Sequence, residues 1–304
     1  MRTVFTVALA SLLALAACGD DPAAAPDAGV VPEGPRTVGG DRPVTVQVPV
    51  TLVAGERYPL VVVLHGYGTA GAVQQAYLQL AELTTTPGAF VVAPAGTVDD
   101  GDNQFWNASD ACCDFADAAP DDVGYLGGII DEIIAGWPID LARVFVVGHS
   151  NGGFMAYRMA CERADVITAI APLAGANVSL DGAGCAPTAP VSILHLHGTA
   201  DGTVAYGGGV LLAGQPPYPG AEASTQAWAT ADGCTGAFAP PAADATLDLV
   251  GGLPGAETAR EVAGGCPAGV AVERWRIAGA GHIPDFSLRL GPALVDWLWS
   301  HPRP

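Results

Sequence analysis

The sequence contains no lysine, and only 12 arginines stand against 31 acidic side chains, which gives a formal net charge of −19. A chain with this much negative charge repels nucleic acid phosphates and anionic membrane surfaces. The composition therefore argues against electrostatic binding to either. The longest apolar run near the start, Val4–Ala17, is too short to span a bilayer comfortably. No internal repeat and no linker interrupt residues 43–304. These absences favour a single domain rather than an array or a membrane-spanning protein.

The N-terminal segment reads as a targeting sequence. Met1-Arg2-Thr3 precedes the apolar run, which ends in Leu15-Ala16-Ala17-Cys18. Small residues before one cysteine resemble a bacterial lipoprotein signal, in which Cys18 is lipidated; the alternative is an ordinary signal peptide. Residues 19–42 are rich in Pro, Gly, Ala and Asp, which predicts a disordered tether before a catalytic domain at 43–304. We expect an exported protein that meets a membrane only through its lipid anchor.

Six cysteines remain beyond Cys18, and an even number in an exported chain indicates disulfides. Metal binding is the alternative, but the adjacent pair Cys112-Cys113 lacks zinc-site spacing. Six cysteines allow fifteen connectivities. We expect Cys234 to pair with Cys266, Cys161 to pair with one of Cys112 and Cys113, and Cys185 to take the other.

Strand-like and helix-like segments alternate along the domain. We expect strands at 44–53, 58–66, 88–96, 144–147, 166–175, 190–198 and 272–277. We expect helices at 70–85, 121–135, directly after Ser150, at 222–231 and at 288–300. Several of the strands are continuous apolar runs, which is typical of strands buried on both faces. The alternation predicts an α/β fold with a mostly parallel, doubly wound sheet.

One strand-to-helix junction carries the pattern Gly148-His149-Ser150-Asn151-Gly152. A nucleophilic serine on such a sharp turn needs glycines on both sides, because a Cβ there would collide with neighbouring segments. The helix that follows aims free N–H groups at a reacting carbonyl. A glycine-rich turn without chemistry is the alternative, so the partners of the serine must decide.

Those partners follow in the order that an α/β hydrolase requires. Asp201 follows the strand at 190–198, and His282 follows the strand at 272–277 through a glycine-rich loop. An Asx turn is the alternative for Asp201, and His301 lacks a comparable setting. We therefore predict the catalytic triad Ser150, Asp201 and His282, with His282 as general base and Asp201 orienting it.

Other polar residues receive smaller roles. The backbone N–H groups of Tyr67, in the loop after a buried strand, and Asn151 are the predicted oxyanion hole. Trp106 and His149 are candidate substrate contacts, and Trp106 could equally be core. His195 and His197 share one strand face but lack carboxylate ligands, so packing near the acid is favoured over a metal site. Asp121-Asp122 could be an acid pair, and helix capping is the favoured reading.

The chain resembles the esterase family that contains secreted polyhydroxybutyrate depolymerases and feruloyl or acetylxylan esterases. The resemblance is carried by PLVVVLHGYG, Trp106 with ACCDFADAAPDDVGYLGGIID, RVFVVGHSNGGFMAYRMACERAD, LHLHGTADGTVAYGGG and IAGAGH. It implies an α/β-hydrolase fold and the same triad. Many members have Trp-Pro-Gly soon after the histidine, where this chain has GHIPDF, so the wall beside His282 differs.

The sequence thus predicts a serine carboxylesterase that acts through a Ser150 acyl-enzyme without a metal or cofactor. A polyhydroxyalkanoate oligomer is the expected substrate, and a feruloyl or acetyl ester of plant cell-wall polysaccharide is the alternative. A serine peptidase is possible on the same fold, and a ligand-binding surface lipoprotein with an inactive triad is the alternative from another class. The expected partners are an ester substrate and no second subunit.

Overall fold

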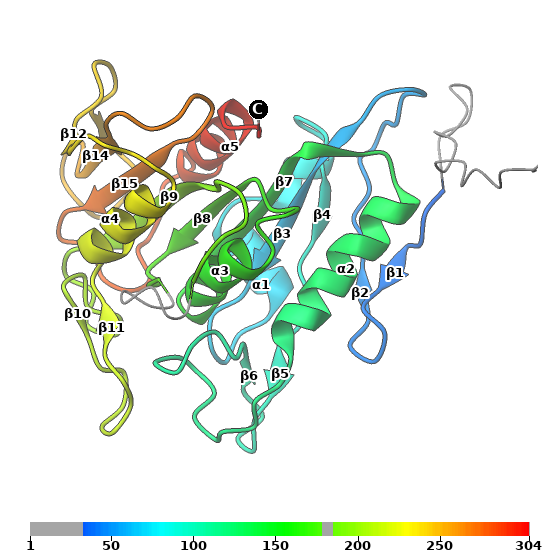
Figure 1. Ribbon diagram of the computed structural model, residues 1–304, viewed down its shortest axis with the longest axis horizontal. Helices are drawn as coiled ribbons and strands as arrows, with labels where there is room; N and C mark the ends of the chain where they lie inside the picture. The colour runs from blue at the N-terminus through cyan, green and yellow to red at the C-terminus, as the bar shows by residue number, and fades with distance from the viewer. Residues whose placement is uncertain (1–32, 178–184, 304) are drawn as a thin grey trace, which may run out of the picture.

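The computed structural model describes residues 33–177 and 185–303. Within these ranges one large sheet has the order β12-β14-β15-β9-β8-β7-β3-β4, and β13 pairs with β14 (Figure 1). Its strands are β3 (Tyr58–Leu64), β4 (Phe90–Val92), β7 (Ile139–His149), β8 (Ala169–Leu173), β9 (Ser192–Gly198), β12 (Phe238–Ala239), β13 (Thr246–Leu247), β14 (Thr258–Ala263) and β15 (Val272–Ile277).

The strands from β15 to β4 are all parallel, and β12, β13 and β14 add an antiparallel edge. The parallel strands β3, β8 and β9 are buried along their whole length. Their continuous Val, Ile and Leu content fits this position, because helices cover both faces. The predicted α/β-hydrolase fold with a mostly parallel sheet is therefore confirmed.

Two hydrophobic cores separate the helices from the sheet. Helices α2 (Asp122–Gly136), α3 (Asn151–Glu162) and α4 (Ala221–Ala231) cover one face, where Leu60 and Val62 of β3 point. Helices α1 (Gly71–Tyr77) and α5 (Leu290–Ser300) and the short 3₁₀ helix η1 (Ala81–Thr84) cover the other, where Val61 and Val63 point. Successive side chains of β3 thus point alternately into the two cores, as the two-residue period of a strand requires.

The segment expected to be a tether ends earlier than predicted. Strand β1 (Thr37–Val38) pairs with β2 (Val44–Thr45), and Val38 is buried. The indole N–H of Trp137 also donates to the carbonyl of Pro35 at 3.1 Å. The boundary at residue 42 is therefore wrong, because residues from about 34 onward pack on the domain. The expected signal segment, Cys18 and the earlier part of the tether lie outside the described residues.

Two expected elements differ in extent, and two hairpins were not expected. The helix predicted at 70–85 is broken into α1 and η1, with Gln79 at φ 60° between them. The strand predicted at 44–53 shrinks to β2 and a single bridge from Gln47 to Val91. Two small hairpins, β5 (Thr97–Val98) with β6 (Gln104–Phe105) and β10 (Gly208–Gly209) with β11 (Tyr218–Pro219), are additions. In the described ranges no helix is long and apolar enough to cross a bilayer.

All six expected disulfide cysteines are paired, but only one expected pairing is correct. Cys234 bonds to Cys266 as predicted. The predicted link between the Cys112-Cys113 pair and Cys161 is wrong, as is the consequent link to Cys185. Cys112 bonds to its neighbour Cys113, and Cys161 bonds to Cys185. The segment that carries Cys185 returns beside the end of α3, with a Cα–Cα distance of 5.4 Å to Cys161, so no partner is left for the adjacent pair except itself.

Candidate active site

Ser150 occupies a left-handed backbone conformation, with φ 55° and ψ −122°, between β7 and α3. A non-glycine residue pays a conformational cost there, and such strain is common at functional sites. The flanking glycines make the turn possible. A Cβ on Gly148 would lie 2.1 Å from the carbonyl oxygen of Gly152, and one on Gly152 would lie 2.2 Å from that of Leu64. The expected steric reason for both glycines is therefore present.

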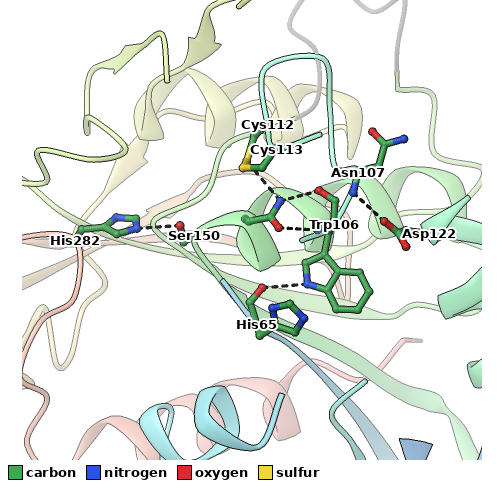
Figure 2. Close-up of a disulfide and its surroundings, with 9 residues drawn as sticks. His65, Trp106, Asn107, Cys112, Cys113, Asp122, Ser150 and His282 are labelled. Carbon is green, nitrogen blue, oxygen red and sulfur yellow. Dashed lines mark hydrogen bonds between the residues drawn. A yellow bond between two sulfur atoms is a disulfide. The ribbon is translucent and has the colours of Figure 1, made fainter. Parts of the chain in front are cut away.

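In the predicted triad, His282 lies within hydrogen-bonding distance of both Ser150 and Asp201. The Ser150 hydroxyl lies 2.9 Å from Nε2 of His282, and Nδ1 of His282 lies 2.8 Å from Oδ2 of Asp201. Figure 2 shows the ring of His282 pointing at Ser150. With Nδ1–H donating to the carboxylate, Nε2 is left as the acceptor for the serine proton.

The sheet explains how residues so far apart in sequence meet. β7, β9 and β15 are parallel members of one sheet, so their carboxyl ends lie on the same edge. The loop that delivers His282 crosses directly over Gly198, where a Cβ would lie 2.3 Å from the Ala280 carbonyl oxygen. The backbone N–H of Ala200 donates to that same carbonyl at 2.9 Å. The acid loop and the histidine loop are thus fixed to each other.

Two backbone N–H groups next to Ser150 are available for an oxyanion. Asn151 is the first residue of α3, where helical N–H groups lack partners within the helix. The loop with Tyr67 passes close by, since a Cβ on Gly66 would lie 3.4 Å from Cβ of Ser150. Across the described residues, no protein acceptor receives the backbone N–H of Tyr67 or of Asn151.

The loop with Tyr67 is held by the β5–β6 hairpin. The Tyr67 hydroxyl donates to Asp99, and the N–H of Gly68 donates to the Gln104 carbonyl at 2.9 Å. The hydrogen bond between Tyr67 and Asp99 raises the pKa of the Tyr67 phenol and lowers the pKa of the Asp99 carboxyl. The hairpin was not among the expected elements, and its link to the oxyanion loop was missed.

Of the two roles left open for Trp106, the structure places it in the core, and it does not line the cavity beside Ser150. It is fully buried, and its indole N–H donates to the His65 carbonyl at 3.0 Å (Figure 2). Its backbone also holds the side chain of Asn151, whose Oδ1 accepts the Trp106 N–H at 2.7 Å and whose Nδ2 donates to the Trp106 carbonyl at 2.9 Å. Trp106 therefore anchors a core segment beneath the first turn of α3.

The Cys112-Cys113 disulfide completes this support. Nδ2 of Asn151, which donates to the Trp106 carbonyl, also lies 3.5 Å from Sγ of Cys112, and Figure 2 shows the disulfide near Trp106. Asn107, the residue after Trp106, donates its backbone N–H to the buried carboxylate of Asp122 at 2.8 Å. The same carboxylate pairs with Arg42 at 2.9 Å. Burial raises the pKa of Asp122. Asp121 caps α2 by accepting the Gly124 N–H, as the capping interpretation requires.

His149 lies under the histidine of the triad. Its Nε2 is 2.9 Å from the His282 carbonyl oxygen, and the two rings stack with centroids 4.9 Å apart. Burial, followed by the positive charge that His282 can carry, lowers the pKa of His149 to about 4. At neutral pH its ring is therefore uncharged, with Nε2–H donating to the carbonyl.

A cavity of about 240 Å³ opens beside Ser150. His149, an expected substrate contact, lines it, as does Tyr67, an expected oxyanion donor. The sequence analysis did not single out Val73, Gln74, Tyr77 and Ile283, which are among the other lining residues. Val73 and Ile283 are exposed apolar side chains, which is itself a signal of a binding surface. The Tyr77 hydroxyl donates to the Pro284 carbonyl at 3.1 Å, which ties α1 to the histidine loop.

Comparison with known proteins shows that the chain is similar to proteins named as esterases. No family model matches it. It is 32% identical over 200 residues, 64% of its length, to "Feruloyl esterase B" of Piromyces equi, and this match spans only 36% of that protein. It is 26% identical to "Putative esterase NocK" of Nocardia uniformis subsp. tsuyamanensis over 95% of this chain and 92% of that one.

Solved structures agree on the fold. The acetyl xylan esterase from Aspergillus awamori has a TM-score of 0.60 at 17% identity, covering 87% of this chain and 98% of that one. Esterase PE8 has a TM-score of 0.52 at 18% identity, covering 88% and 99%. These likenesses show the α/β-hydrolase fold, the sequence relatives are named as esterases, and the serine, histidine and aspartate meet at the carboxyl edge of the sheet.

Proposed function

We propose that the chain hydrolyses carboxylic esters through an acyl-enzyme on Ser150. The hydroxyl of Ser150 attacks the ester carbonyl carbon while Nε2 of His282 takes its proton, and Asp201 orients the ring through Nδ1. His282 then gives that proton to the departing alcohol, and it later activates a water that releases the acid. The observation that carries this proposal is the continuous hydrogen-bonded path from Ser150 to Asp201 at the mouth of a cavity.

The developing negative charge on the carbonyl oxygen would be held by the backbone N–H groups of Asn151 and Tyr67. Donors fixed in this way are each worth about 2.7–4 kcal/mol of transition-state stabilisation. The positive end of α3 lies at the same point and favours the anion further. Because the donors belong to the backbone, their positions depend on the supports of the two loops.

We further propose a small or aromatic uncharged acyl group, with hydroxycinnamoyl or acetyl esters of plant polysaccharides as the substrate class. The relatives named feruloyl esterase support this choice. The cavity also supports it, since about 240 Å³ is below the usual range for drug-sized ligands, and Tyr77 and Val73 offer aromatic and apolar contacts. Oligomers of hydroxyalkanoates, the substrate class first expected from the sequence, fit an apolar cavity as well and remain the second candidate.

A substrate panel tests this proposal. p-Nitrophenyl acetate and p-nitroacetanilide share an acyl group, so their comparison separates an esterase from a peptidase. Methyl ferulate and a hydroxybutyrate trimer separate the two substrate classes. We expect turnover of the acetate ester and of methyl ferulate, little turnover of the anilide, and none by Ser150→Ala. Faster cleavage of the trimer than of methyl ferulate overturns the substrate class, and absence of ester cleavage overturns the function.

We also propose that the protein is exported. The three disulfides in the described ranges are the support for this, since such bonds persist in oxidising compartments. A lipid anchor on Cys18 is part of the same proposal, and a lipid-modified N-terminal peptide in mass spectra of native protein is its expected sign.

A further inference from the structure

Behind Asp201 a chain of buried polar side chains continues into the protein. Nε2 of His197 lies 3.4 Å from Oδ2 of Asp201 and 2.8 Å from the Val204 carbonyl oxygen. Nδ1 of His197 lies 3.1 Å from Nε2 of His195, and Nδ1 of His195 lies 2.9 Å from the hydroxyl of Tyr157 on α3. Both imidazoles and the phenol are at most 1% exposed. The mechanism above uses none of them.

The geometry gives this chain one direction when both rings are neutral. The Val204 carbonyl can only accept, so Nε2 of His197 carries the proton. Nδ1 of His197 must then accept, and its partner is Nε2–H of His195. Nδ1 of His195 accepts in turn from the Tyr157 hydroxyl. Every ring nitrogen is satisfied, as buried polar groups require.

The surroundings keep His195 uncharged. Burial, followed by the neighbouring His197 and Arg274, lowers the pKa of His195 well below its usual value. Arg274 itself is buried and pairs with Glu261 at 2.7 Å. The titratable and charged groups that face this chain and the triad histidine are Tyr206, Arg274 and Arg276 around the histidine pair, and His149 and Tyr77 beside His282.

Asp201 therefore receives hydrogen bonds from several directions. Its Oδ1 accepts the backbone N–H groups of Thr203 and Val204, each at 2.8 Å. Its Oδ2 accepts from Nδ1 of His282 and faces Nε2–H of His197. The hydrogen bonds from His197 and His282 hold the pKa of Asp201 well below its usual value against the opposing effect of burial. Nε2–H of His197 is thus shared between the Val204 carbonyl at 2.8 Å and Oδ2 of Asp201 at 3.4 Å, beside the shorter hydrogen bond from His282.

We propose that His197 is a positioning residue for the triad acid, fixed in its Nε2–H tautomer by His195 and Tyr157, and that it tunes how much negative charge Asp201 presents to His282. This inference rests on the proposed esterase function of the same site. The neutral N–H of His197 withdraws charge from Oδ2. Without it the carboxylate would stabilise the protonated form of His282 more strongly, and protonated His282 cannot accept the serine proton.

The test compares His197→Leu, which removes the donor, with His197→Gln, whose amide can restore one. Thr168→Val is the matched control, because it deletes another buried hydrogen bond, from the Thr168 hydroxyl to the Val144 carbonyl. Thr168 lies at the amino end of β8, whereas the triad lies at the carboxyl ends of the strands. For His197→Leu we expect kcat/KM for p-nitrophenyl acetate to fall about tenfold to hundredfold with KM little changed. We expect the acid limb of its pH–activity profile to move to higher pH. His197→Gln should recover most of both effects, and Thr168→Val should show neither.

A second measurement keeps the inference testable if His197→Leu does not fold. Nitrogen-15 NMR of the imidazole rings of the wild-type protein should show both His195 and His197 as Nε2–H tautomers. An Nδ1–H tautomer at His197 overturns the proposal, as does a folded His197→Leu variant with an unchanged pH profile. Failure of the esterase function would instead appear as a wild-type protein that cleaves no ester, while the NMR result stands by itself.

Discussion

Gly148 is fixed by the space around it rather than by its own conformational freedom. A Cβ there would meet the backbone oxygen of Gly152 at 2.1 Å, and backbone cannot move aside as a side chain can. Gly148→Ala should therefore lower the unfolding free energy by about 1–3 kcal/mol or more, as overpacking does, and displace Ser150.

Gly128 in α2 is the matched control for this change, because a Cβ there would meet nothing within 4 Å. Gly128→Ala should stabilise the protein by up to about 1 kcal/mol, since alanine favours a helix. Urea denaturation of both variants measures the contrast. Equal stability of the two would show that the elbow tolerates a side chain.

Asp201 is the second residue whose replacement separates chemistry from folding. Asp201→Asn keeps the size of the side chain but places an amide where Nδ1–H of His282 donates at 2.8 Å. The wrong tautomer of His282 would then face Ser150, and kcat should fall by about 10³–10⁴-fold. Steady-state kinetics measures this. A loss below about tenfold would show that Asp201 does not orient the histidine.

The first turn of α3 depends on the segment that contains Trp106 and the Cys112-Cys113 disulfide. Asn151 is fully buried, and its amide makes two hydrogen bonds to the Trp106 backbone besides its contact with Sγ of Cys112. Asn151→Ala leaves these two backbone groups unpaired, which should cost about 1–3 kcal/mol each. The variant keeps the backbone N–H of residue 151, the proposed oxyanion donor, but loses the side-chain hydrogen bonds that hold it in place. We therefore expect kcat to fall as well. Chemical denaturation and kinetics together check this, and unchanged stability would contradict the bracing role.

At the level of elements, continuous apolar strands and helix caps were predictable. The Val and Leu run of β3 and the Asp121 cap of α2 are local signals that their surroundings do not override. The break in the helix after residue 70 was not predictable. It occurs at Gln79, whose side chain donates to the Ser287 carbonyl 208 residues away, and the sequence does not reveal so distant a contact. The edge strand β14 was also missed, since its alternation depends on pairing with β15.

The same distinction holds for the site. Ser150, Asp201 and His282 could be named because each follows a strand that the sequence reveals. The role of Trp106 was left open between substrate contact and core, because the sequence does not show its burial against His65 and Asn151. The disulfide partners of Cys161 and of the adjacent pair depend on how loops return in space, and composition carries no information about that.

Across the whole molecule, stability should respond to one buried carboxyl group. Burial raises the pKa of Asp232 to about 7, while in the unfolded chain it is near 4. Between these values the folded protein holds a proton that the unfolded chain has lost. Stability from this group is thus present at low pH and is lost as pH rises toward 7, by up to about 1.4 kcal/mol per unit.

Asp232→Asn removes that loss, because the amide cannot ionise. The unfolding free energies of the variant and the wild type should be nearly equal at pH 4–5. At pH 8 that of the variant should be higher by about 1–4 kcal/mol. Thermal unfolding of both proteins across this range measures the difference, in which His149 and other titrating groups cancel. Parallel stability curves for the two proteins would contradict a raised pKa at Asp232.

The central claim is that Ser150 is an activated nucleophile, and covalent labelling tests it most directly. A fluorophosphonate reacts with a serine whose proton can be taken by a neighbouring base, and it does so whatever ester the protein prefers. Peptide mass mapping of the folded protein should find the phosphonyl group on Ser150, and His282→Ala should react far more slowly. A folded wild-type protein that stays unlabelled, or that carries the label on another serine, would contradict the account.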